Sequence, residues 1–271
     1  MLELLNPPLR LGISGTAVSL LRLHRWNGAP GRVLAEQSIA PSEDGSFAAL
    51  ASALETLFAS TRCQGASLQV VIADDLARFW QVTPPPQALR LSDLDAAIAV
   101  RFHALYGESL AGWTMQADRA IHAPFLAVAM PQTMLDVVQR SAKAHKLAIV
   151  GNAPQFIHCW NRWCKHLASG AWFGVVHGTL LTLGVVDGAR LCALRTLSLP
   201  TNGEADWLAV SLAREALLLG LAAPTRLQVC GALPTALLGT GPVRCEILDG
   251  AGRQGQTHSL AGWLALSGAR W

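Results

Sequence analysis

The chain has 271 residues, of which 51% are hydrophobic and 14% charged, so it is long enough to bury a large core and too apolar to be disordered. Its formal net charge is +3, and the scattered charges argue against nucleic acid as a partner. No apolar stretch reaches the roughly 20 residues of a transmembrane helix, and the start lacks a signal-peptide pattern. The sequence therefore predicts a cytoplasmic protein.

The first half of the chain predicts a three-stranded meander, a helix and a buried strand, followed by an additional segment. Strands are expected over 10–14, 17–23 and 32–39, a helix over 45–60, and a strand over 68–73. After the breaker at 83–86 come a helix over 91–106, with Ser92 and Asp93 as its N-cap, and strands over 113–119 and 124–130. A helix over 132–145, a strand over 147–151 and a helix over 154–167 complete this half.

The second half repeats the order of the first. Strands are expected over 172–176, 180–186 and 191–197, then a helix over 204–219, a strand over 226–230, a short helix near 234–239, a strand over 243–248 and a last helix over 258–267. This duplication predicts an α/β fold with two similar lobes around a cleft. We expect the first lobe over 1–165, with an inserted subdomain at about 84–120, and the second lobe over 166–271.

Two local clusters in the sequence are candidate sites. His158, Cys159, Cys164 and His166 lie close together in the sequence, but on one helix Cys164 points away from Cys159 and His166, so four ligands cannot close a tetrahedron and no metal is expected. The pair Asp74 and Asp75 ends a strand, where α/β enzymes place catalytic groups, although a solvated loop or a helix cap is favoured.

Tryptophan is the most informative side chain, with nine copies against a single tyrosine. Several tryptophans stand beside Arg or Lys at the edges of predicted elements, a composition typical of protein interfaces: Trp26, Trp80, Trp160, Trp163 and Trp271. Packing of large rings at a domain surface explains the same pattern equally well.

Five segments, in this order and spacing, carry a resemblance to a known family: LGISGTAVSLLRL, VTPPPQALRLSDLDAAIAVRF, FLAVAMPQTMLDVVQRSAKAHKL, GVVHGTLLTLGVVDGARLCALRTL and LQVCGALP. The chain resembles the actin-like superfamily and, within it, the PilM and GspL-type cytoplasmic scaffolds of type IV pilus and type II secretion machines. The resemblance covers residues from about 9 to 240. It implies an actin-like (ribonuclease H-like) fold with duplicated βββαβα lobes.

The resemblance also locates two phosphate-binding turns, which in nucleotide-hydrolysing members contain Asp-x-Gly-Thr/Ser. Here the first turn is Ser14-Gly15-Thr16 and the second is His177-Gly178-Thr179, while Gly231 falls at the adenosine-binding position. Both aspartates are missing, and Mg²⁺ needs hard oxygen ligands, so ATP hydrolysis is not expected. The turns are then hairpin structure or a degenerate nucleotide pocket, and no cofactor is expected.

The resemblance implies a non-enzymatic scaffold on the cytoplasmic face of the inner membrane. Such a scaffold holds the cytoplasmic tail of a bitopic PilN-like partner and links that partner to the assembly ATPase. The resemblance does not decide whether the scaffold forms a homodimer. The tail would lie in a groove between the first lobe and the inserted subdomain, bordered by about 74–82 and 91–106. The residues expected on its wall, chosen by position, are Arg78, Phe79, Trp80, Arg101, Phe102 and Tyr106.

Two other functions remain open from the sequence. One is a nucleotide-binding protein or ATP-dependent kinase of the same fold, against which stand the missing carboxylates and the short chain. The other is an unrelated cytosolic α/β enzyme with a pocket that the sequence does not reveal. The three differ in what they bind, because a scaffold needs a peptide, a kinase needs Mg·ATP and the enzyme needs neither.

Overall fold

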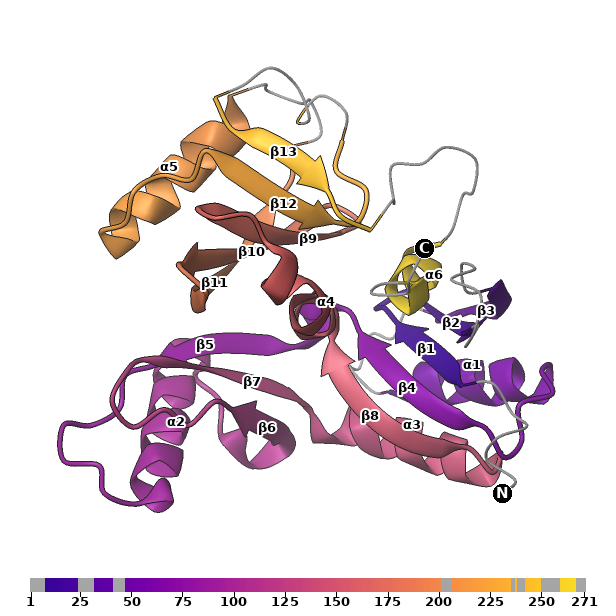
Figure 1. Cartoon of the computed structure of the whole chain (residues 1–271). Helices are drawn as coiled ribbons and strands as arrows, with labels where there is room; N and C mark the ends of the chain where they lie inside the picture. Colours follow the sequence, from indigo (N-terminus) through magenta and orange to yellow (C-terminus); the bar gives the residue numbers. More distant parts are fainter. Residues whose placement is uncertain are drawn as a thin grey trace.

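The computed structural model describes residues 8–23, 32–40, 47–200, 206–234, 237, 242–249 and 259–266. Two five-stranded sheets form two lobes, and a three-stranded sheet forms a subdomain beside them (Figure 1). In the described part of the chain, no helix is long and apolar enough to cross a membrane.

The first lobe is built on a sheet with strand order β3-β2-β1-β4-β8. Its strands are β1 (Leu9–Ile13), β2 (Ala17–Arg22), β3 (Arg32–Ser38), β4 (Ser67–Ile72) and β8 (Ala148–Pro154). The first three are antiparallel, and β4 and β8 then add in parallel. Helices α1 (Ala48–Ala59) and α3 (Gln132–Ala144) contribute their apolar stripes to its core.

The second lobe repeats this topology with strand order β11-β10-β9-β12-β13. Its strands are β9 (Ala171–His177), β10 (Leu180–Asp187), β11 (Arg190–Ser198), β12 (Arg226–Cys230) and β13 (Arg244–Ile247), and α5 (Trp207–Leu219) packs on the sheet. Again three antiparallel strands are followed by two parallel ones. The duplicated α/β architecture expected from the sequence is therefore present.

The subdomain contains a sheet of order β5-β7-β6, made of β5 (Arg78–Val82), β6 (Trp113–Ala117) and β7 (Phe125–Pro131), covered by α2 (Leu91–Tyr106). Its three-stranded sheet begins before, and ends after, the insert expected at 84–120. Strand β5 was not predicted, because both of its faces are covered, one by α2 and the other by the second lobe, and a simple apolar–polar alternation is absent.

Two helices pack on the lobe to which the expected boundary at 165/166 does not assign them. Helix α4 (Gln155–Trp163) places Phe156 and Cys159 in the core of the second lobe. The last helix, α6 (Leu260–Leu266), lies against β1 and β2 of the first lobe (Figure 1). The guanidinium of Arg10 on β1 donates to the carbonyl of Ala265, 3.2 Å away.

Gly12 on β1 permits this packing of α6. A Cβ at Gly12 would lie 2.3 Å from the carbonyl oxygen of Ala261 and 2.7 Å from the backbone nitrogen of Ala265. Because both atoms belong to the helix backbone, only glycine allows α6 to approach so closely.

The start of α2 differs from the expected N-cap at Ser92 and Asp93. The helix begins at Leu91, and the carboxylate of Asp93 accepts the backbone N–H groups of Leu89 and Arg90, each at 3.0 Å. Asp93 thus stabilises the helix start from the third helical position. The short helix expected near 234–239 lies largely outside the described residues.

Candidate functional site

The first predicted phosphate-binding turn joins β1 to β2 and is closed by its own serine. The Ser14 hydroxyl accepts the backbone N–H of Ala17 at 3.0 Å and donates to the Ala17 carbonyl at 3.0 Å. Ser14 is buried, while Gly15 and Thr16 are exposed. Ser14, which lies close to the position of the family's aspartate, therefore uses its hydroxyl within the turn.

The second predicted turn joins β9 to β10 and touches α6. The His177 side chain is buried, and this burial lowers its pKa, against an opposing effect of the nearby Asp75 carboxylate. A neutral imidazole follows at neutral pH. Thr179 is exposed, and a Cβ at Gly178 would lie 3.4 Å from the side chain of Leu260 on α6.

Gly231, at the predicted adenosine-binding position, follows β12 and has a backbone conformation that favours glycine. Its φ is +94°, and a Cβ there would lie 2.4 Å from the carbonyl oxygen of Val176 on β9. Its N–H donates to a carboxylate oxygen of Asp249, 2.8 Å away. These contacts account for the glycine by packing alone.

The acidic pair at the end of β4 lies at the joint between the lobes. Asp74 is buried, and its carboxylate accepts the backbone N–H of Phe156 in the first turn of α4, 2.9 Å away. Burial raises the pKa of Asp74 to about 7, an effect reduced by the Phe156 N–H and Thr182 and increased slightly by Asp75. The structure is closer to the expected helix cap than to a solvated loop, because the Asp74 carboxylate accepts an N–H from the first turn of α4. The capped helix is distant in the sequence, and the carboxylate is buried.

The six residues expected on a partner groove do not lie together on one open surface. Trp80 is 3% exposed and Phe102 is fully buried, both in the core between β5 and α2, so neither can line a groove, and this part of the prediction is corrected. The space between 74–82 and 91–106 is the apolar core of the subdomain. Arg101 is exposed on α2, away from the other five.

The remaining three expected residues form one contact. The Tyr106 hydroxyl donates to the carbonyl of Phe79 at 2.9 Å, and the guanidinium of Arg78 lies 5.3 Å from the centre of the Tyr106 ring. Along β5, Trp80 and Val82 face α2, so the alternation of the strand turns Phe79 and Gln81 toward the second lobe. Only Phe79 among the six lines a cavity described below.

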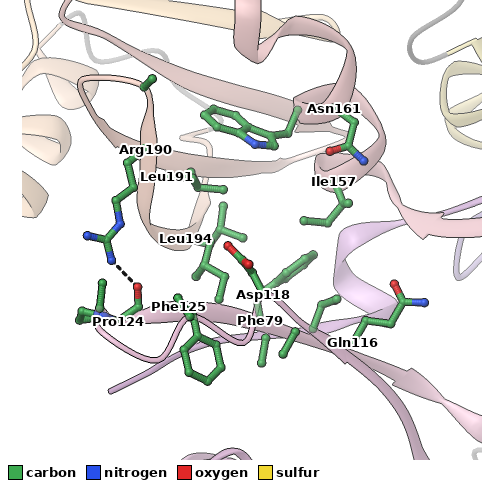
Figure 2. A pocket seen from close by; sticks show the side chains of 18 residues that line it. Phe79, Gln116, Asp118, Pro124, Phe125, Ile157, Asn161, Arg190, Leu191 and Leu194 are labelled. Carbon is green, nitrogen blue, oxygen red and sulfur yellow. Dashed lines mark hydrogen bonds between the residues drawn. The ribbon is translucent and has the colours of Figure 1, made fainter. Parts of the chain in front are cut away.

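A cavity of about 630 Å³, here called the interlobe cavity, lies between the subdomain and the second lobe (Figure 2). Its walls come from β6 and β7 with the loop between them, from α4, and from the β10–β11 hairpin and β11. Most lining side chains are apolar, including Phe79, Ile157, Trp160, Leu191 and Leu194. It is a mainly apolar surface that the topology assembles from distant segments.

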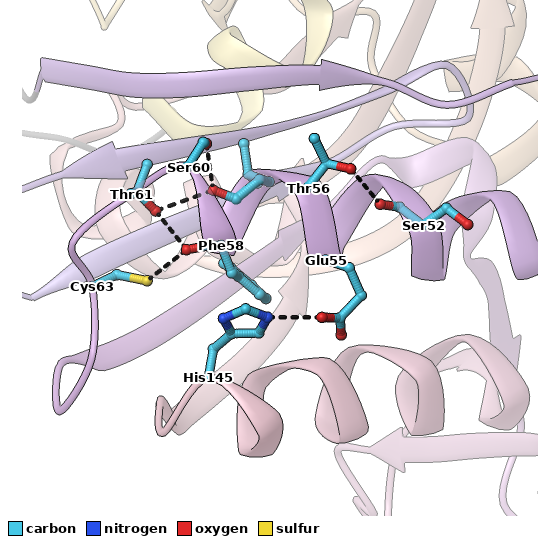
Figure 3. A network of polar contacts seen from close by, with 9 residues as sticks. Ser52, Glu55, Thr56, Phe58, Ser60, Thr61, Cys63 and His145 are labelled. Carbon is cyan, nitrogen blue, oxygen red and sulfur yellow. Dashed lines mark hydrogen bonds and ion pairs between the residues drawn. The ribbon is translucent and has the colours of Figure 1, made fainter.

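A second cavity, also of about 630 Å³ and here called the tail groove, lies between the first lobe and the subdomain. Its walls are one face of α3 along its whole length, the edge strand β8, Val70 on β4 and Thr114 on β6. Lys143 and Lys146 stand on its rim. The end of α3 is fixed to α1, because His145 Nε2 lies 2.8 Å from a carboxylate oxygen of Glu55 (Figure 3).

Sequence reasoning missed most residues of both cavities. Trp160 was singled out as an edge aromatic and does line the interlobe cavity, where it stacks on Phe156 with ring centres 6.3 Å apart. Trp163 instead lies under the guanidinium of Arg162, while Trp26 and Trp271 lie outside the described residues. Nothing in the local sequence marks Asp118 or Arg190, because only the tertiary fold places both on the cavity lining. In the described residues, no cluster of metal-ligating side chains is present.

Comparison with known proteins gives structural matches only. No protein-family profile matches the sequence, and no curated protein matches it. The chain is similar to the PilM–PilN type IV pilus biogenesis complex, with 15% identity, coverage of 97% of both chains and a TM-score of 0.62. It is also similar to the cytoplasmic domain of EpsL, an inner membrane component of the type II secretion system of Vibrio cholerae, with 12% identity, coverage of 96% and 93%, and a TM-score of 0.58.

A third similar structure is a protein of unknown function from Bacteroides thetaiotaomicron with an actin-like ATPase fold, at 11% identity, coverage of 90% and 91%, and a TM-score of 0.59. The duplicated sheets, together with matches over nearly whole chains, define an actin-like fold. Within that class, the fold is of the PilM and GspL type, as the sequence indicated.

Proposed function

We propose that this protein is a non-enzymatic scaffold of a type IV pilus or type II secretion assembly, which binds the cytoplasmic tail of a bitopic PilN-like membrane protein. The observation that carries the proposal is the tail groove, which lies between the first lobe and the subdomain. Similarity to PilM in a complex with PilN and to the EpsL cytoplasmic domain supports it. On this proposal the partner's membrane segment holds the scaffold at the cytoplasmic face of the inner membrane, and the assembly ATPase is a further partner.

The tail groove has the properties that an extended peptide needs. Strand β8 forms the edge of its sheet, so an added strand gains main-chain hydrogen bonds there. A register shift in the β4–β8 pair leaves Val150 67% exposed on that strand. Lys143 and Lys146 favour a tail that presents acidic side chains or carbonyl groups to the rim.

The proposal predicts that a charge reversal at Lys143 weakens tail binding. Lys143→Glu is expected to lower the affinity for the synthetic cytoplasmic tail of the PilN-like protein from the same genome by about tenfold, since exposed ion pairs contribute up to about 1 kcal/mol each and a reversal also adds repulsion. Fluorescence anisotropy of the labelled tail measures the effect.

Lys165→Glu is the matched control, because Lys165 is exposed and lies outside the tail groove. Its affinity for the tail should stay within about twofold of the unchanged protein. Equal losses in the two variants, or no binding of the tail to the unchanged protein, contradict the proposal.

A nucleotide titration separates the scaffold from the kinase or ATPase alternative. We expect no change in thermal stability on adding ATP or ADP, with or without Mg²⁺, because Ser14 is used within its own turn and neither turn carries a carboxylate. A nucleotide that binds at one hundred times its Kd stabilises the fold by about 2.7 kcal/mol, which is easily measured. A Mg²⁺-dependent increase in Tm would replace the scaffold with a nucleotide-binding function.

A further inference from the structure

The interlobe cavity is distinct from the tail groove and shares no lining residue with it. Its apolar wall has two sides. Phe79, Leu126 and Val128 belong to the subdomain, and Leu191 and Leu194 belong to β11 of the second lobe. At about 630 Å³ it is large enough for two or three side chains of a bound segment.

The two charged side chains on its described lining, Asp118 and Arg190, are not paired with each other. Figure 2 shows Asp118 turned into the cavity, and its carboxylate has no hydrogen-bond or ion-pair partner among the described residues. Arg190, the one cation among the described lining residues, donates to the backbone carbonyl of Pro124 instead (Figure 2). Arg119, the neighbour of Asp118, is paired with Asp95 at 2.8 Å. A ligand with a positive charge therefore finds a carboxylate without competition from the protein.

The cavity also borders a strand edge. Strand β11 is the outermost strand of its sheet, and the described residues give it no second strand partner. The carbonyl of Cys192 on β11 accepts a hydrogen bond from the Gln81 side chain of β5 at 2.8 Å, so a polar donor from outside the sheet already uses this edge at that residue. An extended backbone fits beside such an edge better than a compact ligand does.

We propose that the interlobe cavity is a second docking site, which takes a short extended segment of a partner protein with a large apolar side chain next to a Lys or Arg. The apolar side chain lies between Phe79 and Leu194, and the cation pairs with Asp118. This site goes beyond the proposed function, because its residues and its charge preference both differ from those of the tail groove.

The test uses two capped hexapeptides, Ala-Leu-Phe-Arg-Leu-Ala and its counterpart with Glu in place of Arg. The full chain is labelled with 5-fluorotryptophan, and the ¹⁹F resonance of Trp160 is assigned by its loss in Trp160→Phe. The Arg peptide is expected to shift this resonance at millimolar concentration and to bind about fivefold more tightly than the Glu peptide, since an exposed ion pair contributes up to about 1 kcal/mol.

Three variants make the result specific. Asp118→Asn should reduce the preference between the peptides to within about twofold, whereas Asp75→Asn, which removes the same charge at an exposed position outside the cavity, should retain it. Leu191→Glu, at a half-buried position of the wall, should abolish binding of the Arg peptide while leaving the folded spectrum intact. Lys143→Glu should have no effect, which separates this site from the tail groove.

Three outcomes would overturn the proposal. One is that neither peptide moves the Trp160 resonance. Another is that the Arg preference persists in Asp118→Asn. The third is that both peptides bind equally, because the cavity would then take an apolar ligand without regard to charge.

Discussion

Gly12→Ala is expected to lower the free energy of unfolding by about 3 kcal/mol and to displace α6 from the first lobe. The added Cβ would lie 2.3 Å from the carbonyl oxygen of Ala261 and 2.7 Å from the nitrogen of Ala265. Both are backbone atoms of α6, so no side-chain rotation relieves the overlap. Moving the helix also exposes Leu264, which is fully buried against Val71 and Ala73.

Gly15→Ala is the matched control for this substitution. Gly15 lies three residues further along, and a Cβ there would have no atom within 4 Å. Its free energy of unfolding should therefore change by no more than about 0.5 kcal/mol, with a small gain expected from the stiffer unfolded chain. Urea unfolding followed by far-ultraviolet circular dichroism compares the two, and similar stabilities for both variants would mean that α6 does not pack on Gly12.

Asp74→Asn is expected to stabilise the protein at alkaline pH and to remove a pH dependence of its stability. The folded pKa of Asp74 is raised from 3.8 to about 7, chiefly by burial. A raised carboxyl pKa means that the folded state holds the proton more tightly than the unfolded chain. The stabilising contribution is then complete below pH about 4 and is lost as the pH rises through about 7, by about 4 kcal/mol in all.

Asparagine keeps the carbonyl oxygen that accepts the Phe156 N–H and carries no titratable group. Urea unfolding at about pH 5 and about pH 8 gives the free energy of unfolding of both proteins. From the lower to the higher pH, the free energy of unfolding of Asp74→Asn relative to the unchanged protein should rise by about 2 to 4 kcal/mol. Asp75→Asn is the control, since Asp75 is exposed and only a minor cause of the shift. A parallel pH profile for the unchanged protein and Asp74→Asn would show that Asp74 is ionised in the fold.

Repetition made the two lobes predictable from the sequence, whereas the subdomain was predictable only in part. Each meander has hairpin signals such as Asp187-Gly188, and the central parallel strands β4 and β12 are mainly apolar. Strand β5 lacks such a signal, because Arg78 covers the rings of Tyr106 and Trp113 while Phe79 faces the other way. Periodicity alone does not distinguish a strand covered on both faces from a loop.

The candidate sites were less predictable than the fold, since they depend on contacts between distant segments. Position along the chain placed Trp80 and Phe102 on a groove wall, but their rings lie 5.0 Å apart in the subdomain core. The interlobe cavity has Asp118 and Arg190 on one lining, although they are more than seventy residues apart in the sequence. No local pattern encodes this placement, and it follows only from the way the subdomain rests against β11.

The position of α6 on the first lobe affects how the protein folds during synthesis. The strands of the first lobe's sheet lie within residues 9–154, but the helix that covers Leu21 and Val71 is synthesised about a hundred residues later. Domains generally fold from the N-terminus as they emerge, so the nascent first lobe retains an uncovered apolar face until α6 has been synthesised. A nascent chain that ends before residue 260 therefore exposes this apolar face, and chaperones bind such exposed apolar surface.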